Sequence, residues 1–533
     1  MNAMSAFTGV GPLVRFVLRR DRVYLPVWVL SLVVLTYVSA AAVRRTYDTP
    51  VEIASYAVNM GTSPASIAMG GPPVALREIG GILIYETSLT VLLGVALMAV
   101  FTVVRHTRKE EDAGRVELLG STVVSPHAVI TAAVLVAAGA SVLVGAGVTW
   151  SFLVEQQPVR ESVLFGAAVA AMGIVFTGVG ACAAQVMSHG RGAVGLSLAF
   201  LGVAFGLRAI GDVGENAWSW LSPMGWSQQV RVYDDNRWWP LALSLVLTAA
   251  LLVGTVLFEG RRDLGAGIVP SRPGPPSAGR TLAGVVGLAW RLQRGAVVGW
   301  VVGIWSMGLL LGSFSESIQN MIEDNPTLAE YLQRAGVTNI VDSFFATSLL
   351  LLGIGASGFA VASALRTRSE ESAGRVEPLL ATGVSRARWL FGTLLVTLGG
   401  TTLVVASGGL GVGMSYALTT GRSSEMWRMT GYALVYLPAV LLLAALVVLL
   451  VGWLPRASGA VWVAVALCFV VGWLGSLLEL PQWAADLSPF THVPAVPAVP
   501  ADDLALGPVL TMLALAVAAL AAGWVGFRRR DIG

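Results

Sequence analysis

Charged residues are scarce in this chain of 533 residues: they make up 12% of it, while 55% of its residues are hydrophobic. A soluble domain carries about 25% charged residues, so the composition excludes an ordinary soluble enzyme or binding domain. Cysteine occurs only at Cys182 and Cys468, both inside long apolar segments, and this excludes a disulfide framework. The four histidines are scattered without ligand spacing, so no metal site is indicated. We therefore expect an integral membrane protein.

Lysine is almost absent as well, and its one occurrence, Lys109, follows an arginine. A phosphate-binding P-loop needs the order Gly-x-x-x-x-Gly-Lys-Ser/Thr, which therefore occurs nowhere in the chain. We expect the chain to bind no cofactor itself. The net charge of +3 gives no reason to expect nucleic acid as a partner.

Apolar sequence is what the chain has in abundance. A helix of roughly 20 apolar residues crosses a bilayer core. Six windows in each half of the chain meet that length, and we predict an all-α integral membrane protein of twelve transmembrane helices. The windows are 23–43, 85–104, 128–153, 164–187, 193–210, 240–258, 297–313, 345–365, 389–418, 431–454, 459–478 and 504–527.

The charges between these windows predict the orientation. With the N-terminus inside, the inner segments hold 24 of the 34 basic residues and the outer segments hold 10. Basic residues collect on the cytoplasmic side of a membrane. We therefore predict that both termini are cytoplasmic.

Two charged segments between apolar windows are near copies of each other. We name them the first island, residues 107–125, and the second island, residues 367–385; 13 of their 19 positions are identical. Leu-Ser-Pro also occurs twice, at 221–223 and 487–489, and Arg-Arg-Asp-Leu/Ile-Gly ends both halves, at 261–265 and 529–533. We predict a first half at 1–265, a Pro- and Gly-rich linker at 266–280 and a second half at 281–533. Six spans per half would give the two halves the same orientation, as parallel repeats.

Each island joins the second and third spans of its half, and charge in lipid is costly, so it must lie in water. The spacing of Glu110, Gly114 and Glu117 predicts one short helix, with Glu111 and Arg115 paired four residues apart. Such a helix would be a surface for electrostatic contact with a soluble partner. A solvated loop that only enforces topology is the alternative, although topology alone has little use for acids.

Two further pairs of segments lie at the predicted membrane faces. Phe7–Arg22 and the segment after the linker mix apolar and basic residues, which predicts amphipathic helices on the inner leaflet. The connections around the two Leu-Ser-Pro sequences are rich in aromatic residues, which suits short helices that dip back into the outer leaflet. The long outer segments 44–84 and 315–343 are polar enough to form short helices.

With Glu-Glu-x-Ala-Gly-Arg-Val-Glu in both islands, the chain resembles the permease subunits of ABC-2 type exporters, which have a type V exporter-like fold. It is most similar to the actinobacterial polyketide-antibiotic (tetronasin-type) and multidrug efflux permeases. The resemblance implies a bacterial plasma-membrane exporter, whose islands are coupling helices seated on a separate ATP-binding subunit, in two copies, that holds ATP and Mg. The residues implied to couple are Glu110, Glu111, Gly114, Arg115, Glu117, Glu370, Glu371, Gly374, Arg375 and Glu377. Pro378 in place of Leu118 departs from the match, so the two docking surfaces need not be equal.

The resemblance also implies a substrate cavity between the halves, formed by the second and fifth spans. Its candidate lining residues are Met98, Phe101, Phe200, Phe205, Phe359, Phe469 and Trp473. Few ionisable residues fall within the spans, which favours hydrophobic or amphipathic cargo such as drugs, polyketides or lipids. A proton-driven multidrug carrier with two six-helix halves is the alternative function, and an assembly or sensor protein without transport activity is a third.

Overall fold

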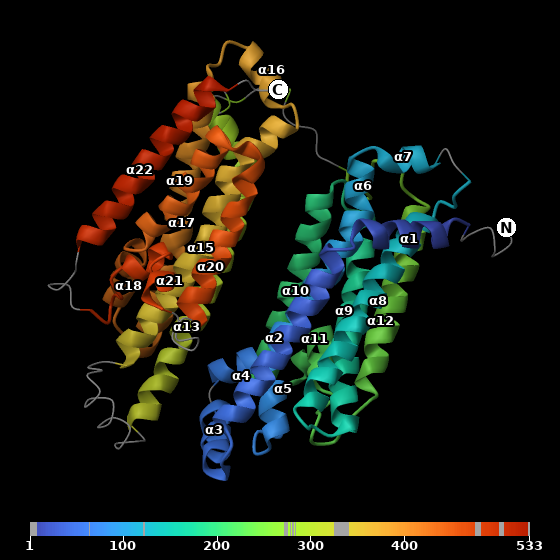
Figure 1. Ribbon diagram of the computed structural model, residues 1–533. Helices are drawn as coiled ribbons and strands as arrows, with labels where there is room; N and C mark the ends of the chain where they lie inside the picture. Colours follow the sequence, from blue (N-terminus) through green and yellow to red (C-terminus); the bar gives the residue numbers. More distant parts are fainter. Residues whose placement is uncertain are drawn as a thin grey trace. The chain divides into compact units, whose positions relative to one another are not determined.

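The computed structural model is built of helices in two compact units, Met1–Gly274 and Pro275–Gly533 (Figure 1). It describes residues 8–530 except 63, 121–122, 271–275, 278, 280–281, 283, 324–339, 475–480 and 500–505. The boundary between the units falls inside the predicted linker 266–280, part of which lies outside the described residues.

Twelve helical segments of the described chain are long and apolar enough to cross a membrane, six in each unit. The prediction of an all-α integral membrane protein with twelve spans is thereby confirmed. The spans of the first unit are α2 (Tyr24–Thr46), α5 (Ile79–His106), α8 (Ala128–Val154), α9 (Val159–Val186), α10 (Gly190–Val213) and α12 (Pro240–Glu259). Those of the second are α13 (Val285–Glu323), α15 (Ile340–Ser372), α17 (Arg386–Thr420), α18 (Ser424–Leu434) with α19 (Leu437–Trp453), η4 (Pro455–Ala460) with α20 (Val461–Leu474), and α22 (Leu506–Arg529).

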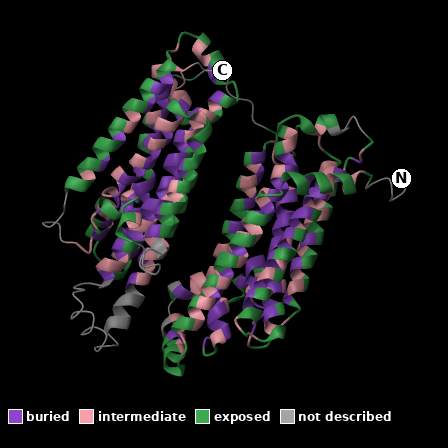
Figure 2. Ribbon diagram, in the orientation of Figure 1, coloured by how far each residue is buried: buried purple, intermediate pink, exposed green. Residues whose placement is uncertain are grey.

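The second, third and fourth spans form the core of each unit. In the first unit α5, α8 and α9 are 56% to 78% buried, whereas α2, α10 and α12 are 17% to 28% buried. The second unit repeats this division, with α15, α17 and the α18–α19 span inside. Figure 2 shows the buried residues on these central helices and exposed residues along the outer ones. The first, fifth and sixth spans therefore leave apolar faces for contact with lipid or another protein surface.

Glycines let neighbouring spans approach closely. A Cβ on Gly145 of α8 would lie 2.4 Å from the carbonyl oxygen of Gly166 on α9. A Cβ on Gly308 of α13 would lie 2.3 Å from the carbonyl oxygen of Gly408 on α17. Small residues at such contacts are typical of membrane helices, which gain packing energy from close approach rather than from leaving water.

The two halves begin differently, and the prediction of two separate amphipathic helices was wrong for the second half. In the first unit α1 (Val10–Arg20) ends at Asp21, and α2 starts anew at Tyr24. The buried Asp21 carboxylate accepts a 2.5 Å contact from His106 Nε2 and lies 3.3 Å from Arg105 Nη2. The matching residue, Gln293, is a better helix former, and α13 runs through it without a break.

Short helices close the end of each unit opposite its island. In the first unit these are α3 (Pro50–Thr62), α4 (Pro64–Gly70), η2 (Ala217–Leu221) and α11 (Pro223–Gln228). In the second they include α21 (Gln482–Ala485) and η5 (Pro489–His492), while most of the segment 315–343 lies outside the described residues.

The serine of each Leu-Ser-Pro sequence caps the start of a short helix in this region. The buried Ser222 hydroxyl accepts hydrogen bonds from the amides of Met224 and Gly225, and the buried Ser488 hydroxyl accepts one from Phe490. Serine is a favoured N-cap, and proline suits the first helical turn. Each Leu-Ser-Pro therefore starts a short helix next to the last span.

Candidate functional site

The first island is a bent segment rather than the single helix predicted from its spacing. It consists of α6 (Arg108–Asp112) and α7 (Arg115–Gly120), which are separated by Gly114 with a φ of +69°. This left-handed conformation suits glycine and ends a helix. The amide of Gly114 donates a 2.9 Å hydrogen bond to the carbonyl of Glu111 and closes the turn.

The second island bends at the matching residue. Here α15 continues to Ser372, Gly374 has a φ of +66°, and α16 (Val376–Ala381) follows. The amide of Gly374 donates to the carbonyl of Glu371, and the amide of Arg375 donates to that of Glu370, at 2.9 and 3.1 Å. These two bonds define a Schellman motif, the common glycine-based end of a helix. The repeated Ala-Gly-Arg thus encodes a bend.

The bend decides which charges pair. The predicted pair of Glu111 with Arg115 is wrong, because Arg115 instead binds Glu110 through Nε and Nη2, at 2.6 and 2.9 Å. Arg375 Nε binds Glu370 at 2.6 Å in the second island. These carboxylates raise the pKa of both guanidinium groups above the ordinary value. The first acid and the arginine of each island therefore hold its bend closed.

The second acid of each island points inward and binds the end of its own half. Both oxygens of Glu111 accept hydrogen bonds from Arg262, at 2.6 and 3.0 Å, and Oε1 also accepts one from the amide of Gly265. Glu371 accepts a 2.5 Å bond from Arg530. The side chains of Glu111 and Glu371 are 8% and 4% exposed. These two acids are therefore unavailable as outward docking charges in this conformation.

The first island has further attachments. Arg108 is buried and donates to the carbonyls of Ser188, Gly265 and Ala266. Asp112 accepts a 2.7 Å bond from the amide of Gly190, the first residue of α10. Among the described residues, the matching Ser372 bonds to the carbonyl of Ser369 in its own helix. The first island is therefore tied to the connection between α9 and α10, and the described part of the second half shows no equivalent of the bond from Asp112 to Gly190.

The third acid of each island is exposed to solvent. Glu117 and Glu377 are exposed, and within the described residues neither makes an ion pair. Beside Glu117, Leu118 is 72% exposed. Next to this island a hollow of about 460 Å³ is lined on its apolar side by Val116, Val124, Val129, Ile130 and Leu264. An exposed apolar patch with polar residues at its rim is typical of a protein-binding surface.

Two comparisons with known proteins bear on this arrangement. Residues 282–528 match the family described as "Multidrug efflux system permease Rv1217c, C-terminal domain". The chain is also 40% identical over 531 residues to the multidrug efflux system permease protein Rv1217c of Mycobacterium tuberculosis, an alignment that covers 99% of this chain and 96% of that protein. The chain belongs to the family of multidrug efflux system permeases. As a multidrug efflux permease it is a membrane transporter, and the twelve spans agree with a multi-pass membrane protein.

The predicted cavity residues of this permease lie in different surroundings. Met98 and Phe359 are at most 1% exposed, inside the cores of their own units. Phe101 and Phe205 are half-buried, the former against Trp28 and the latter under Arg208. Phe200 and Phe469 are 37% and 50% exposed, while the side chain of Trp473 lies outside the described residues. A cavity between the halves stays a prediction, and Phe200 and Phe469 have the exposure that it needs.

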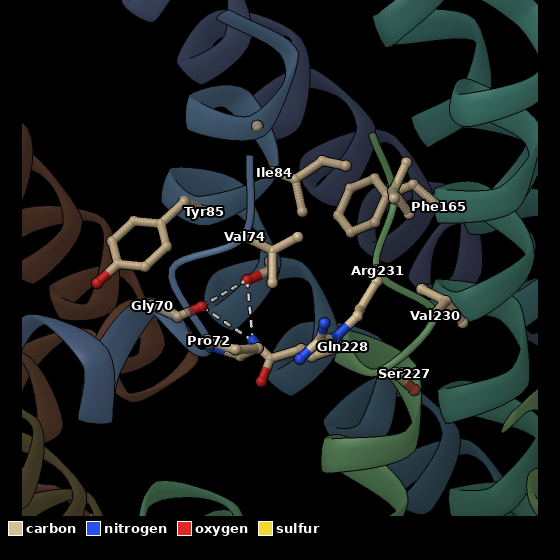
Figure 3. Close-up of a pocket in the computed structure, with 13 residues that line it drawn as sticks. Gly70, Pro72, Val74, Ile84, Tyr85, Phe165, Ser227, Gln228, Val230 and Arg231 are labelled. Atoms are coloured by element: carbon tan, nitrogen blue, oxygen red, sulfur yellow. Dashed lines mark hydrogen bonds between the residues drawn. The ribbon is translucent and has the colours of Figure 1, made fainter. Parts of the chain in front are cut away.

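Polar bonds join the short helices of the first unit to its spans. Gln228 of α11 donates to the carbonyl of Gly70 and to the Ser88 hydroxyl, at 2.9 and 3.2 Å, beside a small pocket (Figure 3). Arg208 of α10 donates to the carbonyls of Ala68 and Met69 at the end of α4. Tyr56 of α3 donates to Glu86 of α5. This network fixes α3 and α4 over the ends of α5 and α10, and sequence reasoning did not find it.

No group of three or more His, Cys, Asp or Glu residues that could hold a metal ion occurs in the part of the chain that the structure describes.

The sequence did not predict the contacts of Arg262 and Arg530, although it contained a signal for them. Both arginines stand second in the repeated Arg-Arg-Asp-x-Gly. A motif repeated at the end of each half, on the same predicted face of the membrane as the repeated acidic island, was the available indication of contact.

Proposed function

We propose that this permease is the membrane subunit of an ATP-driven ABC exporter that extrudes hydrophobic or amphipathic compounds. A separate ATP-binding subunit, in two copies, holds ATP and Mg and docks beneath the two islands in the cytoplasm. One observation carries this proposal: two bent charged islands, alike in sequence and in internal pairing, each expose an acid that makes no ion pair with any described residue.

The geometry gives each charge of the island its own task. Glu110 with Arg115, and Glu370 with Arg375, keep the bend closed, so that α7 and α16 remain distinct short helices. Glu117 and Glu377 then offer their charge to basic residues of the ATP-binding subunit. Exposed charges of this kind raise association rates and fix the register of an interface. ATP-driven closure of the two subunits would push on both islands and rock the halves between inward- and outward-facing states.

Cargo is inferred from the spans. Their exposed surface is largely apolar, and two ionisable side chains near the ends of spans, Arg208 and Glu86, are engaged in hydrogen bonds. A cavity with so little free charge suits lipophilic drugs, polyketides or lipids. The relative from M. tuberculosis is named a multidrug efflux permease, which agrees with this cargo class. We place the protein in the bacterial plasma membrane with both termini in the cytoplasm.

The test is ATP hydrolysis and cargo export in proteoliposomes that contain this permease and its candidate ATP-binding subunit. Wild type should stimulate hydrolysis, and Glu117→Arg with Glu377→Arg should abolish both stimulation and co-purification of the subunit. Glu215→Arg is the matched control, since Glu215 is an exposed acid without an ion pair in the described part of the first unit, at the end opposite the island. Normal stimulation and export by the Glu117/Glu377 variant would refute docking through the islands.

A proton-driven carrier is the second candidate, and one observation favours it. Arg208 and Asp212 lie 3.7 Å apart on α10, and their side chains are 0% and 2% exposed. A buried ionisable pair in a span is a candidate proton site. If no ATP-binding subunit binds to the wild-type permease, export driven by a pH gradient and its loss in Asp212→Asn would establish this second function.

A further inference from the structure

We propose that Arg262 and Arg530 are positioning residues that lock each island to the end of the sixth span in its half, so that a push on the island moves α12 or α22. This inference rests on the proposed function, because it concerns how force applied at the islands reaches the spans. We name the two contacts the first clamp, Glu111 with Arg262, and the second clamp, Glu371 with Arg530.

The first clamp is a buried, two-bond contact. Arg262 lies three residues after the end of α12, and its two terminal nitrogens bind the two oxygens of Glu111. Its remaining nitrogen, Nε, donates a 2.5 Å bond to Gln185 near the end of α9. The guanidinium therefore joins the island, the sixth span and the fourth span. A bidentate pair of this kind fixes distance and angle together, which a single contact between long side chains does not.

The second clamp joins the same two positions in the other unit, through one hydrogen bond where the first clamp has two. Arg530 follows α22 directly and donates a 2.5 Å hydrogen bond to Glu371. The central carbon of its guanidinium group lies 5.2 Å from the centre of the Phe527 ring. Its carbonyl accepts a 2.9 Å bond from Arg386, the first residue of α17. The same acid of the island and the same arginine of Arg-Arg-Asp-x-Gly are used in both halves, although the neighbouring contacts differ.

A contact of this kind can transmit displacement because it is costly to break. Breaking it takes from a nearly buried carboxylate the arginine that lies nearest to it, and leaves Glu111 with Arg108 at 2.9 Å and Glu371 with Arg368 at 3.4 Å. The island cannot then move away from the sixth span without losing the contact, so both move together or the clamp opens. The sixth spans are among the least buried helices of their units, which leaves them free to shift against lipid.

Neighbouring arginines provide a matched control. Arg261 and Arg529 precede the clamp residues, carry the same charge and are exposed, and within the described chain neither makes an ion pair. Replacing them changes the net charge and the basic flank of the span by the same amount. A difference between the two sets of variants therefore reports the clamp itself.

The experiment compares Arg262→Gln with Arg530→Gln against Arg261→Gln with Arg529→Gln in proteoliposomes that contain the ATP-binding subunit. We expect the clamp variant to bind the subunit and stimulate hydrolysis like wild type, but to export about tenfold fewer cargo molecules per ATP, within the range of ordinary coupling between sites. The control variant should match wild type. If the glutamine variants do not reach the membrane, Arg262→Lys with Arg530→Lys keeps the charge and removes the bidentate fork of the first clamp, and should lower the same ratio.

A charge exchange separates positioning from simple support of the fold. Glu371→Arg with Arg530→Glu should restore export per ATP relative to either single variant, since the nearby Arg368 is partly exposed and can turn to water. Wild-type coupling in the clamp variant, or an exchange variant as uncoupled as its single variants, would overturn the inference. If the wild-type permease binds no ATP-binding subunit, the proposed function has failed instead, and the two failures are thus distinguishable.

Discussion

The bend of the first island can be tested by replacing Gly114 with alanine. A Cβ at this position meets nothing within 4 Å, so the cost is conformational and not steric. The left-handed φ of +69° costs alanine about 1 kcal/mol or more. Alanine also favours a continuous helix over glycine by about 1 kcal/mol. Together these effects change the free-energy difference between the bent and the straight island by about 2 kcal/mol in favour of the straight form. The equilibrium constant between the two forms then changes roughly thirtyfold.

Amide hydrogen exchange in lipid nanodiscs measures this shift directly. The amides of Arg115, Val116 and Glu117 open α7 and have no partner within that helix, because the first turn of a helix leaves its donors free. In a continuous helix they would bond to the carbonyls of residues 111 to 113. Gly114→Ala should therefore slow their exchange by up to about thirtyfold. Loss of the bend should also separate Arg115 from Glu110.

Two further variants make the prediction refutable. Gly114→Asn should lie between wild type and alanine, because asparagine tolerates the left-handed conformation better than alanine does. Gly295→Ala lies inside α13, where an added Cβ also meets nothing within 4 Å, and should leave exchange in the island unchanged. Equal exchange in the wild type and the alanine variant would show that the bend does not depend on glycine.

Three other predictions concern the opposite end of the units and can be checked by thermal unfolding in nanodiscs. Ser222→Ala should lower the free energy of unfolding by about 1–2 kcal/mol, and Ser488→Ala should lower it by less, because Ser222 caps two amides and Ser488 caps one. Equal losses in the two variants would contradict this account of the caps. Gly71→Ala should lower the unfolding temperature, because Gly71 has a φ of +104° and its Cβ would lie 2.4 Å from Gln228, whereas Gly61→Ala meets ordinary contacts and should be neutral. Arg208→Met should destabilise by about 3–5 kcal/mol because it leaves Asp212 buried and unpaired; Arg208→Met with Asp212→Asn should recover part of that loss, and no recovery would show that the pair is not the cause.

The spans and the islands were predictable from the sequence because both are local patterns. Apolar windows of span length and the repeated Glu-Glu-x-Ala-Gly-Arg-Val-Glu need no knowledge of long-range contacts. The pairing inside the islands was predicted wrongly because helical spacing was extended through Gly114 and Gly374. Glycine one residue beyond a run of helix formers is a signal for a helix end, and its repetition in both islands strengthened that signal.

Contacts between distant segments were not predictable in the same way. Glu111 and Arg262 lie 151 residues apart, and nothing in either segment alone indicates that they meet. The sequence also did not predict that Met98 and Phe359 are buried within their own units. A helix that is apolar on all sides does not indicate which of its faces meets which neighbour. The different start of the second half accompanies several changes, among them Gln293 and Val298 where the first half has Asp21 and Pro26.

The difference at one pair of matching positions, Asp112 and Ser372, has a consequence for how such proteins evolve. A transporter assembled from two identical chains must accept every substitution on both sides at once. In a single chain that contains both copies, Asp112 can be attached to Gly190 on one side while, among the described residues of the other, Ser372 bonds within its own helix. Duplication within one gene therefore lets natural selection adjust the two sides of the transporter separately, and it lets an experimenter disable either side alone.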